Sequence, residues 1–430
     1  MTRVIIVGGG IGGLALAQGL RKSGVAVAVH ERDRHRADRL QGFRIHINPH
    51  GSRALSDCLP PELFAAFVAS GGKGGNELTF VTERMKRLLR LDEDITTGGS
   101  SAPEDGHYGV SRITLRQILL SGLEDVVHFD KKFERYELEP DGRVTAHFAD
   151  GTSATGDVLV GADGGGSRVR AQYLPHAGRV DTGIVAIAGK YMLTEESRAL
   201  LPPELRSGPL SVMPPKSCSM FVAPHELDGG VGVNDRDDPG ALFDNTKPYV
   251  FWAFAAKREY YGTDVESLGC LELRDLALKM TTGWAPQLRA MVALSEVDTL
   301  TALPIRSAVA VEKWTSSAVT LLGDAVHSMT PFRGIGANTA LRDAQLLCRK
   351  LVAADRGGPL VGGIAEYEAE MTGYGFAAVR TSLEAAQRAV GGTKAARLTS
   401  RGVFRVLDAV PALKRRAFGG FEDQDAVRER

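Results

Sequence analysis

Residues 4–13 have the sequence VIIVGGGIGG, and this stretch decides the fold class. Val4–Val7 is a short, continuously apolar run, which is typical of a strand buried on both faces of a parallel sheet. Gly8, Gly10 and Gly13 follow in the spacing G-x-G-x-x-G. In this pattern the first glycine makes a tight turn, the second admits a pyrophosphate, and the third lets the next helix pack against the sheet. The stretch therefore predicts a dinucleotide-binding unit.

The residues that follow support this interpretation. Apolar positions from Leu14 to Leu20 predict a helix after the glycines, whose N-terminus offers free N–H groups and the positive end of a dipole to an anion. Glu31 ends the second predicted strand, near the spacing of about 20 residues expected for the carboxylate that accepts the ribose hydroxyls. An acid at this place favours an unphosphorylated ribose, and therefore FAD or NAD over NADP. We also place the adjacent Arg32 at the cofactor.

Two further apolar runs end in aspartates, in Gly161-Ala162-Asp163-Gly164 and in Gly323-Asp324-Ala325. Ligands bind where parallel strands end, so both aspartates are expected at the ligand. A second glycine loop, residues 331–338 (PFRGIGAN), precedes a predicted helix whose N-terminus can stabilise negative charge. A cofactor held by two helix N-termini must be long, so FAD fits better than NAD.

The pattern along the chain predicts an α/β protein with a Rossmann-like FAD-binding domain, an inserted antiparallel-sheet substrate domain and C-terminal helices. Strand-helix alternation gives way to a strand-rich stretch and then returns. Asp141-Gly142 and Asp150-Gly151 predict hairpin turns. The expected FAD-binding domain is discontinuous and the substrate domain interrupts it. The former comprises residues 1–75, 105–177 and 297–390, and the latter 76–104 and 178–296. Residues 391–430 form a helical tail, whose polar last dozen residues are expected to fray.

Composition excludes several classes of protein. Lys+Arg and Asp+Glu both number 52, so the net charge is zero, which argues against a nucleic-acid partner. No apolar run approaches the ~20 residues that span a membrane. The four cysteines form no CxxC pair, which favours a reducing cytoplasm and argues against a disulfide framework or a zinc cluster. The ten histidines show no paired metal-ligand spacing, and we expect no metal.

Taken together, these motifs resemble the single-component FAD-dependent aromatic hydroxylases, the family of monooxygenases that includes p-hydroxybenzoate hydroxylase and the tetracycline-inactivating enzymes. The resemblance implies a p-hydroxybenzoate hydroxylase-like fold. It also implies that Asp163 contacts both FAD and NAD(P)H, that Asp324 contacts the ribityl and ribose part of FAD, and that Arg112, in an R-x-x-L motif, lies near the flavin.

Candidate site residues follow from the motifs and the resemblance together. Pro331 and Arg333 are candidates near the flavin, and no catalytic side chain is assigned. Trp252 and Phe254 alternate along a predicted strand, so one face of it would line the substrate pocket, with an ordinary sheet core as the alternative. The expected cofactor-binding set is Gly8, Gly10, Gly12, Gly13, Glu31, Arg32, Arg44, Arg112, Asp163, Gly323, Asp324, Gly334, Gly336, Ala337 and Asn338.

The resemblance implies an enzyme of secondary metabolism in which NAD(P)H reduces FAD and the reduced flavin takes up O2 at C4a. The resulting hydroperoxide would transfer one oxygen atom to an aromatic or polycyclic small molecule. A flavin-dependent halogenase is an alternative, although its W-x-W-x-I-P motif is absent from the chain. A flavin-binding protein without turnover and an NAD-dependent dehydrogenase are two others. Substrate identity and the choice among hydroxylation, epoxidation and Baeyer–Villiger oxidation stay open.

Overall fold

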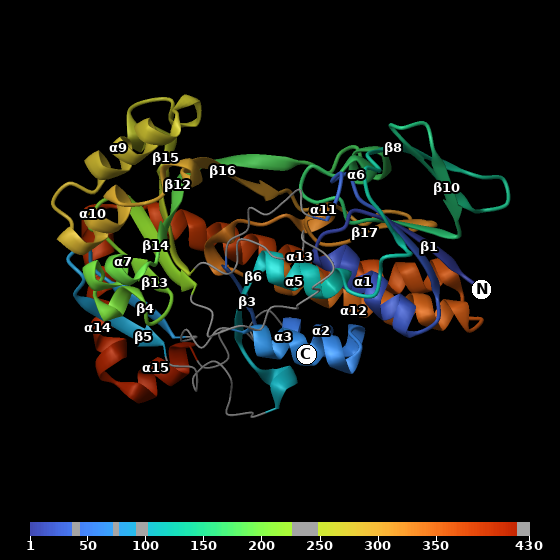
Figure 1. Cartoon of the computed structure of the whole chain (residues 1–430), viewed down its shortest axis with the longest axis horizontal. Helices are drawn as coiled ribbons and strands as arrows, with labels where there is room; N and C mark the ends of the chain where they lie inside the picture. The colour runs from blue at the N-terminus through green and yellow to red at the C-terminus, as the bar shows by residue number, and fades with distance from the viewer. Residues whose placement is uncertain (37–43, 72–76, 92–101, 226–247, 419–430) are drawn as a thin grey trace.

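The computed structural model describes residues 1–36, 44–71, 77–91, 102–225 and 248–418. Two lobes lie side by side, each built on its own β-sheet (Figure 1). This arrangement agrees with the fold class that the sequence predicts.

The first lobe contains a five-stranded sheet in which every neighbouring pair of strands is parallel. The central strands are apolar and fully buried because helices cover both faces of the sheet. Helix α1 packs against α2, α5 and α12. In spatial order the strands are β17 (Val319–Leu321), β11 (Val158–Gly161), β1 (Arg3–Val7), β2 (Ala26–His30) and β7 (Val127–His128), and the helices of this lobe are α1 (Ile11–Lys22), α2 (Pro49–Cys58), α3 (Pro61–Ser70), α5 (Arg112–Leu120), α6 (Arg168–Tyr173), α11 (Asp324–His327) and α12 (Gly336–Asp355).

Two small antiparallel units complete this lobe. One is a three-stranded sheet whose predicted hairpin turns at Asp141-Gly142 and Asp150-Gly151 are confirmed, since both glycines adopt a positive φ. The other is a two-stranded ribbon that lies between the lobes in Figure 1. The strands are β8 (Phe133–Leu138), β9 (Val144–Phe148) and β10 (Ser153–Gly156) in the sheet, and β3 (Arg44–Ile47) and β6 (Tyr108–Ser111) in the ribbon.

The second lobe is built on a seven-stranded sheet whose pairs are antiparallel except for β13 with β4. Strands from the predicted 76–104 segment join its edge, and the sheet also takes in residues 301–308, beyond the expected boundary at 296. In spatial order the strands are β16 (Thr301–Ala308), β12 (Arg179–Met192), β15 (Tyr249–Lys257), β14 (Cys218–His225), β13 (Leu210–Val212), β4 (Leu78–Val81) and β5 (Arg87–Leu91), and the helices are α7 (Glu195–Leu200), α8 (Arg258–Tyr261), α9 (Cys270–Met280) and α10 (Pro286–Ala293). Short 3-10 helices occupy Pro103–Asp105, Pro203–Leu205, Val265–Ser267, Val297–Thr299 and Pro331–Arg333.

One face of the large sheet is closed by helices α9 and α10, and Trp252 and Phe254 belong to that face. Both side chains are fully buried in the core between the sheet and these helices. The indole Nε1 of Trp252 donates to Ser295 Oγ at 2.7 Å, and Phe254 packs edge-on against Tyr261. The expectation that these two rings line a substrate pocket is therefore wrong. Their alternation along the strand does put them on one face, but that face is the covered one.

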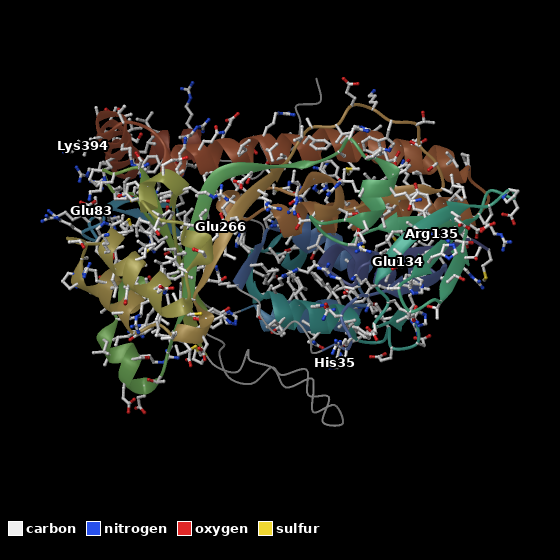
Figure 2. The ribbon with its side chains drawn as sticks, turned by 90° about the horizontal axis from the view of Figure 1, so that it is seen from above. His35, Glu83, Glu134, Arg135, Glu266 and Lys394 are labelled. Carbon is white, nitrogen blue, oxygen red and sulfur yellow. The ribbon has the colours of Figure 1, made fainter. Side chains whose placement is uncertain are left out.

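Helix α13 (Leu360–Val390) runs along both lobes (Figure 2). Glu83, Glu266 and Lys394 lie in the lobe of the large sheet, whereas Glu134 and Arg135 lie in the opposite lobe. Near its end, α13 packs on the sheet face opposite Trp252, where Ala386 and Val390 meet Ile184, Ala186 and Ala255. Although α13 has 31 residues, neither it nor another helix in the described ranges is long and apolar enough to cross a membrane.

The C-terminal helices α14 (Lys394–Ala409) and α15 (Pro411–Phe418) pack against the second lobe. Buried Arg397 donates to the carbonyl oxygens of Pro214 (2.9 Å) and Cys218 (2.7 Å). The predicted helical tail is thus attached to the sheet as far as Phe418. Its last dozen residues, expected to fray, lie outside the described residues.

The covered position of Trp252 generates a prediction about stability. Replacement of Trp252 by alanine leaves a cavity and removes the indole donor to Ser295 Oγ, so we expect the free energy of unfolding to fall by about 3–5 kcal/mol. Urea denaturation measures this change. Ser295→Ala, which removes the hydroxyl that accepts from Trp252 and donates to the carbonyl of Met291, should cost about 1–2 kcal/mol. Unchanged stability in Trp252→Ala, with weaker binding of a small molecule, would instead restore a pocket role.

Candidate active site

The sequence motifs meet at one edge of the parallel sheet. All five strands point the same way, so their carboxyl ends share an edge. In the order β17, β11, β1 and β2, these ends carry Asp324, Asp163, Gly8 and Glu31. Four motifs that lie far apart in the sequence therefore line one edge.

The first glycine turn leaves space for a ligand at the N-terminus of α1. Gly8 has a φ of +112°, and a β-carbon there would lie 2.4 Å from the carbonyl oxygen of Ala162, so no side chain fits. Gly13 is close to the carbonyl of Gly8, and Gly12 faces Leu322. Gly10, the residue before α1, has nothing within 4 Å of the position that a β-carbon would take. This open position beside free N–H groups fits a pyrophosphate.

Glu31 holds the glycine turn in place. Its Oε2 accepts a hydrogen bond from the backbone N–H of Gly9 at 2.5 Å, and its Oε1 accepts from Asp33 N–H at 2.9 Å. The side chain is buried, whereas the neighbouring Arg32 is exposed. A carboxylate oxygen can accept more than one hydrogen bond, so these contacts leave Glu31 capacity for a ribose hydroxyl.

Arg116 also supports this turn, and sequence reasoning missed it. Its Nε donates to the carbonyl of Gly9 at 3.0 Å, and its Nη2 lies 3.3 Å from Asp33 Oδ2. The signal in the sequence was its position four residues after Arg112, which places both arginines on one face of α5. Arg112 itself is exposed, and it lies close enough to Asp324 for its charge to act on that carboxyl.

The two aspartates keep acceptor capacity free. Asp163 Oδ2 accepts from the N–H of Arg168 at 2.7 Å, but its Oδ1 is buried without a hydrogen-bond partner among the described residues. Asp324 has an exposed surface, but the protein around its carboxyl desolvates it and so raises its pKa. The charges of His327, Arg112 and Arg179 oppose this effect. In the described ranges, these carboxylates join no group of His, Cys, Asp or Glu side chains suited to a metal ion. Their free oxygens fit the hydroxyl groups of a nucleotide cofactor.

Behind Asp324, a buried carboxylate organises the end of β17. Asp343 of α12 is fully buried, and its Oδ2 accepts from Gly323 N–H at 2.8 Å and lies 2.7 Å from His327 Nε2. Tyr374 of α13 donates its hydroxyl to Asp343 Oδ1 at 2.5 Å. Burial lowers the pKa of His327, but its contact with Asp343 outweighs burial and raises it. His327 is therefore a positioning residue, and Asp343 has a part that the sequence motifs did not show.

The second glycine loop begins α12. Gly334 has a φ of +66°, and Gly336 and Ala337 form the first turn of the helix. Asn338 is buried, and its amide donates to the carbonyl of His46 and accepts from the N–H of Asn48, both at 2.9 Å. Its side chain thus joins β3 to α12. Because the Asn338 side chain is occupied in this way, the backbone N–H groups of the loop are the donors that can contact a cofactor.

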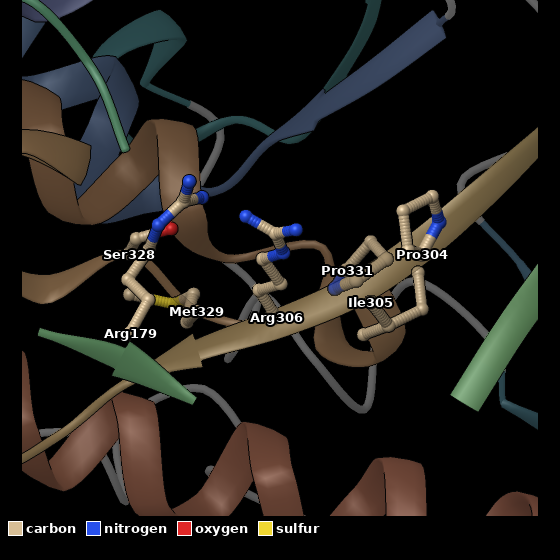
Figure 3. Close-up of a pocket in the computed structure, with 7 residues that line it drawn as sticks. All are labelled: Arg179, Pro304, Ile305, Arg306, Ser328, Met329 and Pro331. Carbon is tan, nitrogen blue, oxygen red and sulfur yellow. The ribbon is translucent and has the colours of Figure 1, made fainter. Parts of the chain in front are cut away.

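A pocket of about 370 Å³ opens next to this loop. Figure 3 shows the guanidinium groups of Arg179 and Arg306 pointing to the same side of β16. Ser328, Met329 and Pro331 supply the wall that leads to the glycine loop, while Arg333 is held away by a hydrogen bond to Thr381 on α13. The lining residues are Arg179, Pro304, Ile305, Arg306, Ser328, Met329 and Pro331. Two cationic groups beside an open space suit an anion.

Comparison with known proteins places these features in context. The family model described as "FAD binding domain" matches residues 280–382, and the "NAD(P)-binding Rossmann-like domain" model matches residues 6–56. The chain is similar to a solved protein from Photorhabdus luminescens assigned as an FAD-containing monooxygenase. The identity is 36% and the TM-score 0.80, over 91% of this chain and 99% of the other.

Two fungal relatives are also similar. The dual O-methyltransferase/FAD-dependent monooxygenase CTB3 of Cercospora beticola is 32% identical over 86% of this chain, but the chain spans only 44% of that protein's length. The FAD-dependent monooxygenase thnD of Trichoderma harzianum is 29% identical, and the match covers 89% of this chain and 92% of the relative. The chain thus spans less than half of CTB3 and nearly all of thnD.

The buried Asp343 generates a testable prediction. Asp343→Asn removes the charge that three donors face, so we expect the free energy of unfolding to fall by about 3–5 kcal/mol. Tyr374→Phe, a milder variant, removes one donor and should cost roughly 1–3 kcal/mol. Denaturant titration of both proteins checks the order. An Asp343→Asn variant that unfolds like the unaltered protein would contradict the organising role of this carboxylate.

Proposed function

Because the chain belongs to the family of FAD-dependent monooxygenases, we propose that it inserts one atom of O2 into a small aromatic or polycyclic molecule, with NAD(P)H as the reductant. The names of CTB3 and thnD support this activity. A role in secondary metabolism belongs to the same proposal. The four cysteines are all free, which supports a reducing cytoplasm as the location.

The observation that carries the proposal is the meeting of two glycine loops at one sheet edge. Gly12 on α1 lies against Leu322, at the end of β17, and against Ala340 of α12. The N-termini of α1 and α12 therefore flank the same edge, and the free oxygens of Asp163 and Asp324 lie along it. This arrangement suits a long cofactor with anionic groups toward both ends, as FAD is.

Different residues of the site suit different parts of this cofactor. The open position at Gly10 and the N–H groups of α1 suit the pyrophosphate, and Glu31 and Asp324 offer acceptors to hydroxyl groups. The N-terminus of α12 suits the end of the ring system that becomes negative. FAD, when bound, supplies the redox chemistry and the activation of O2.

The large sheet supplies the substrate side of the site. On the face opposite Trp252, strand alternation places Phe221 and Phe251 with the small residues Ala223 and Ala253. Phe221 is 40% exposed, and Phe251 is partly exposed. Aromatic rings separated by alanines leave room for a flat apolar molecule and exclude water from it, as a reactive oxygen-transfer site requires.

The direct test of the function is product analysis with isotope-labelled O2. The purified protein should be yellow, release FAD, and consume NAD(P)H faster when aromatic compounds are added. A product that carries one labelled oxygen atom supports the proposal. Products that require chloride would show a halogenase instead, and reductant consumption without an oxygenated product over a broad panel would show a flavoprotein without oxygen transfer.

Asp324 provides a prediction about cofactor affinity. If its carboxylate accepts a hydrogen bond from a cofactor hydroxyl, Asp324→Ala should weaken FAD binding by about 10–100-fold. Titration of the apoprotein with FAD, followed by flavin fluorescence, measures this change. Asp275→Ala serves as the control because Asp275 is largely exposed on α9 in the other lobe. Equal FAD affinity in both variants would remove Asp324 from the cofactor site.

The pocket beside the second glycine loop provides a prediction about the reductant. Its two arginines suit the phosphates of NAD(P)H, so Arg306→Ala should raise the KM for NAD(P)H roughly 10-fold while FAD stays bound. Steady-state kinetics with varied NAD(P)H measures the effect. Arg135→Ala, which removes an exposed arginine from the far side of the first lobe, is the matched control. An unchanged KM in Arg306→Ala would place the reductant elsewhere.

A further inference from the structure

Arg44, at the start of β3, carries a charge that the described chain does not neutralise. Its side chain lies over Gly109 on the paired strand β6, where any β-carbon would collide with the guanidinium group. Its Nη2 is buried and has no hydrogen-bond partner, and no ion pair to Arg44 is present among the described residues. Burial lowers the pKa of Arg44 to about 10, so the group is still charged at neutral pH.

Tyr249 and His225 of the large sheet both interact electrostatically with this guanidinium, and Lys190 lies beside Tyr249. His225 ends β14 and pairs in register with Tyr249 at the start of β15, and their rings lie 5.0 Å apart. Lys190 of β12 places its Nζ 4.7 Å from the centre of the Tyr249 ring. His225 is 3% exposed, and its Nε2 has no hydrogen-bond partner among the described residues. We call Arg44, Lys190, His225 and Tyr249 the basic cluster.

The positive charge of the basic cluster suits an anionic ligand. Burial, together with the charges of Arg44 and Lys190, lowers the pKa of His225 to about 4, so its imidazole is neutral at pH 7 and able to donate one N–H. Arg44 and Lys190 both contribute positive charge. A buried guanidinium costs free energy unless an acceptor meets it, and its planar fork matches an anionic oxygen group.

The position of the cluster connects it with the proposed active site. His225, Tyr249 and Lys190 lie on the sheet face opposite Trp252, at the end that β6 approaches. Helix α13 covers the other end of this face at Ala186 and Ala255. Asn338 ties β3, which carries Arg44, to the first turn of α12. The cluster therefore lies between the second glycine loop and the substrate-side sheet.

We propose that the basic cluster binds an anionic oxygen group, a carboxylate or a phenolate, on the aromatic substrate. Arg44 is the main contact, with His225 as a neutral donor and Lys190 as a second charge. This inference rests on the proposed function, since it assumes that the substrate lies against this sheet face. It changes the sequence-based expectation that Arg44 contacts the cofactor, because its guanidinium is grouped with side chains of the large sheet and not with the glycine turn.

Equilibrium binding to the oxidised, FAD-loaded protein without reductant tests the proposal. The probes are matched pairs: 2-hydroxybenzoate with 2-hydroxybenzamide, and 4-nitrophenol above its pKa with 4-nitroanisole. The perturbation of the flavin absorbance and calorimetry both report the Kd. We expect the unaltered protein to bind an anionic member at least 10-fold more tightly than its neutral partner. The preferred pair then identifies whether a carboxylate or a phenolate is recognised.

The variants assign the preference to the cluster. Arg44→Met should lose the anionic preference and keep the affinity for the neutral probes, Arg44→Lys should keep part of it, and His225→Gln should weaken it less than Arg44→Met does. Arg388→Met removes an exposed charge from α13 and should change nothing. Because no ion pair to Arg44 is found in the part of the chain that the structure describes, Arg44→Met should melt at the same temperature as the unaltered protein or higher, which shows that the variant is folded.

Three results would overturn the proposal. Equal affinity for both members of each pair in the unaltered protein excludes an anion site. An anionic preference that survives in Arg44→Met places the site elsewhere. Loss of FAD from Arg44→Met, at an unchanged melting temperature of the apoprotein, assigns Arg44 to a cofactor phosphate. These binding results are independent of turnover, so a protein that shows the preference but inserts no oxygen contradicts the proposed function and not the anion site.

Discussion

The carboxylate of Asp343 is the contact on which the arrangement of the candidate site depends. A fully buried negative charge is tolerated only where donors surround it, and here the donors come from three elements. Gly323 lies at the end of β17, His327 belongs to α11, and Tyr374 belongs to α13, and all three contact the Asp343 carboxylate. Because α13 continues along the second lobe, the same carboxylate that orders the Asp324 turn also fixes the helix that supports the large sheet. Gly375 allows this approach, since a β-carbon there would lie 2.6 Å from the His327 ring.

The parallel sheet imposes the second constraint. Its strands end at one edge, so the loops that follow them are packed closely together. Glycine is required where a neighbouring loop or side chain leaves no room for a β-carbon. Gly8 against Ala162 and Gly12 against Leu322 are two such contacts. Because the loops at this edge are so close together, a single ligand can contact loops that are hundreds of residues apart in the sequence. The antiparallel sheet of the second lobe has no such edge, and it contributes a surface in place of a set of loops.

The sequence predicted the parts of this protein that follow from local rules. The first glycine turn, the hairpins at Gly142 and Gly151, and the strand ends at Asp163 and Asp324 each depend on a few consecutive residues. The sequence did not predict which face of β15 is covered by helices. Side chains that alternate with a period of two show that Trp252 and Phe254 share a face, but not that helices pack on that face. Asp343 and Arg116 were missed for a related reason. Their partners lie on other elements, and nothing near them in the sequence marks a buried acid or a supporting arginine.

Burial alone does not distinguish a structural polar group from one that binds a ligand. The distinguishing feature is whether its buried atoms have hydrogen-bond partners within the protein. Buried Glu368 accepts from Ser316 and Thr320, so its charge is satisfied within the fold. His30 has no hydrogen-bond partner in the described ranges, but it is stacked on Phe148 and its pKa is lowered to about 4, chiefly by burial, so it is a neutral aromatic ring of the core. Asp163 and Arg44 differ from both, since each keeps a buried atom of a charged group without a partner. A fold that leaves a charge uncompensated loses stability, and binding of the complementary group recovers it. Within the described residues, the lobe of the parallel sheet thus keeps one carboxylate oxygen without a partner, and the boundary with the large sheet keeps one guanidinium nitrogen without a partner. This pattern is expected where a hydroxyl donor binds on one side and an acidic group on the other.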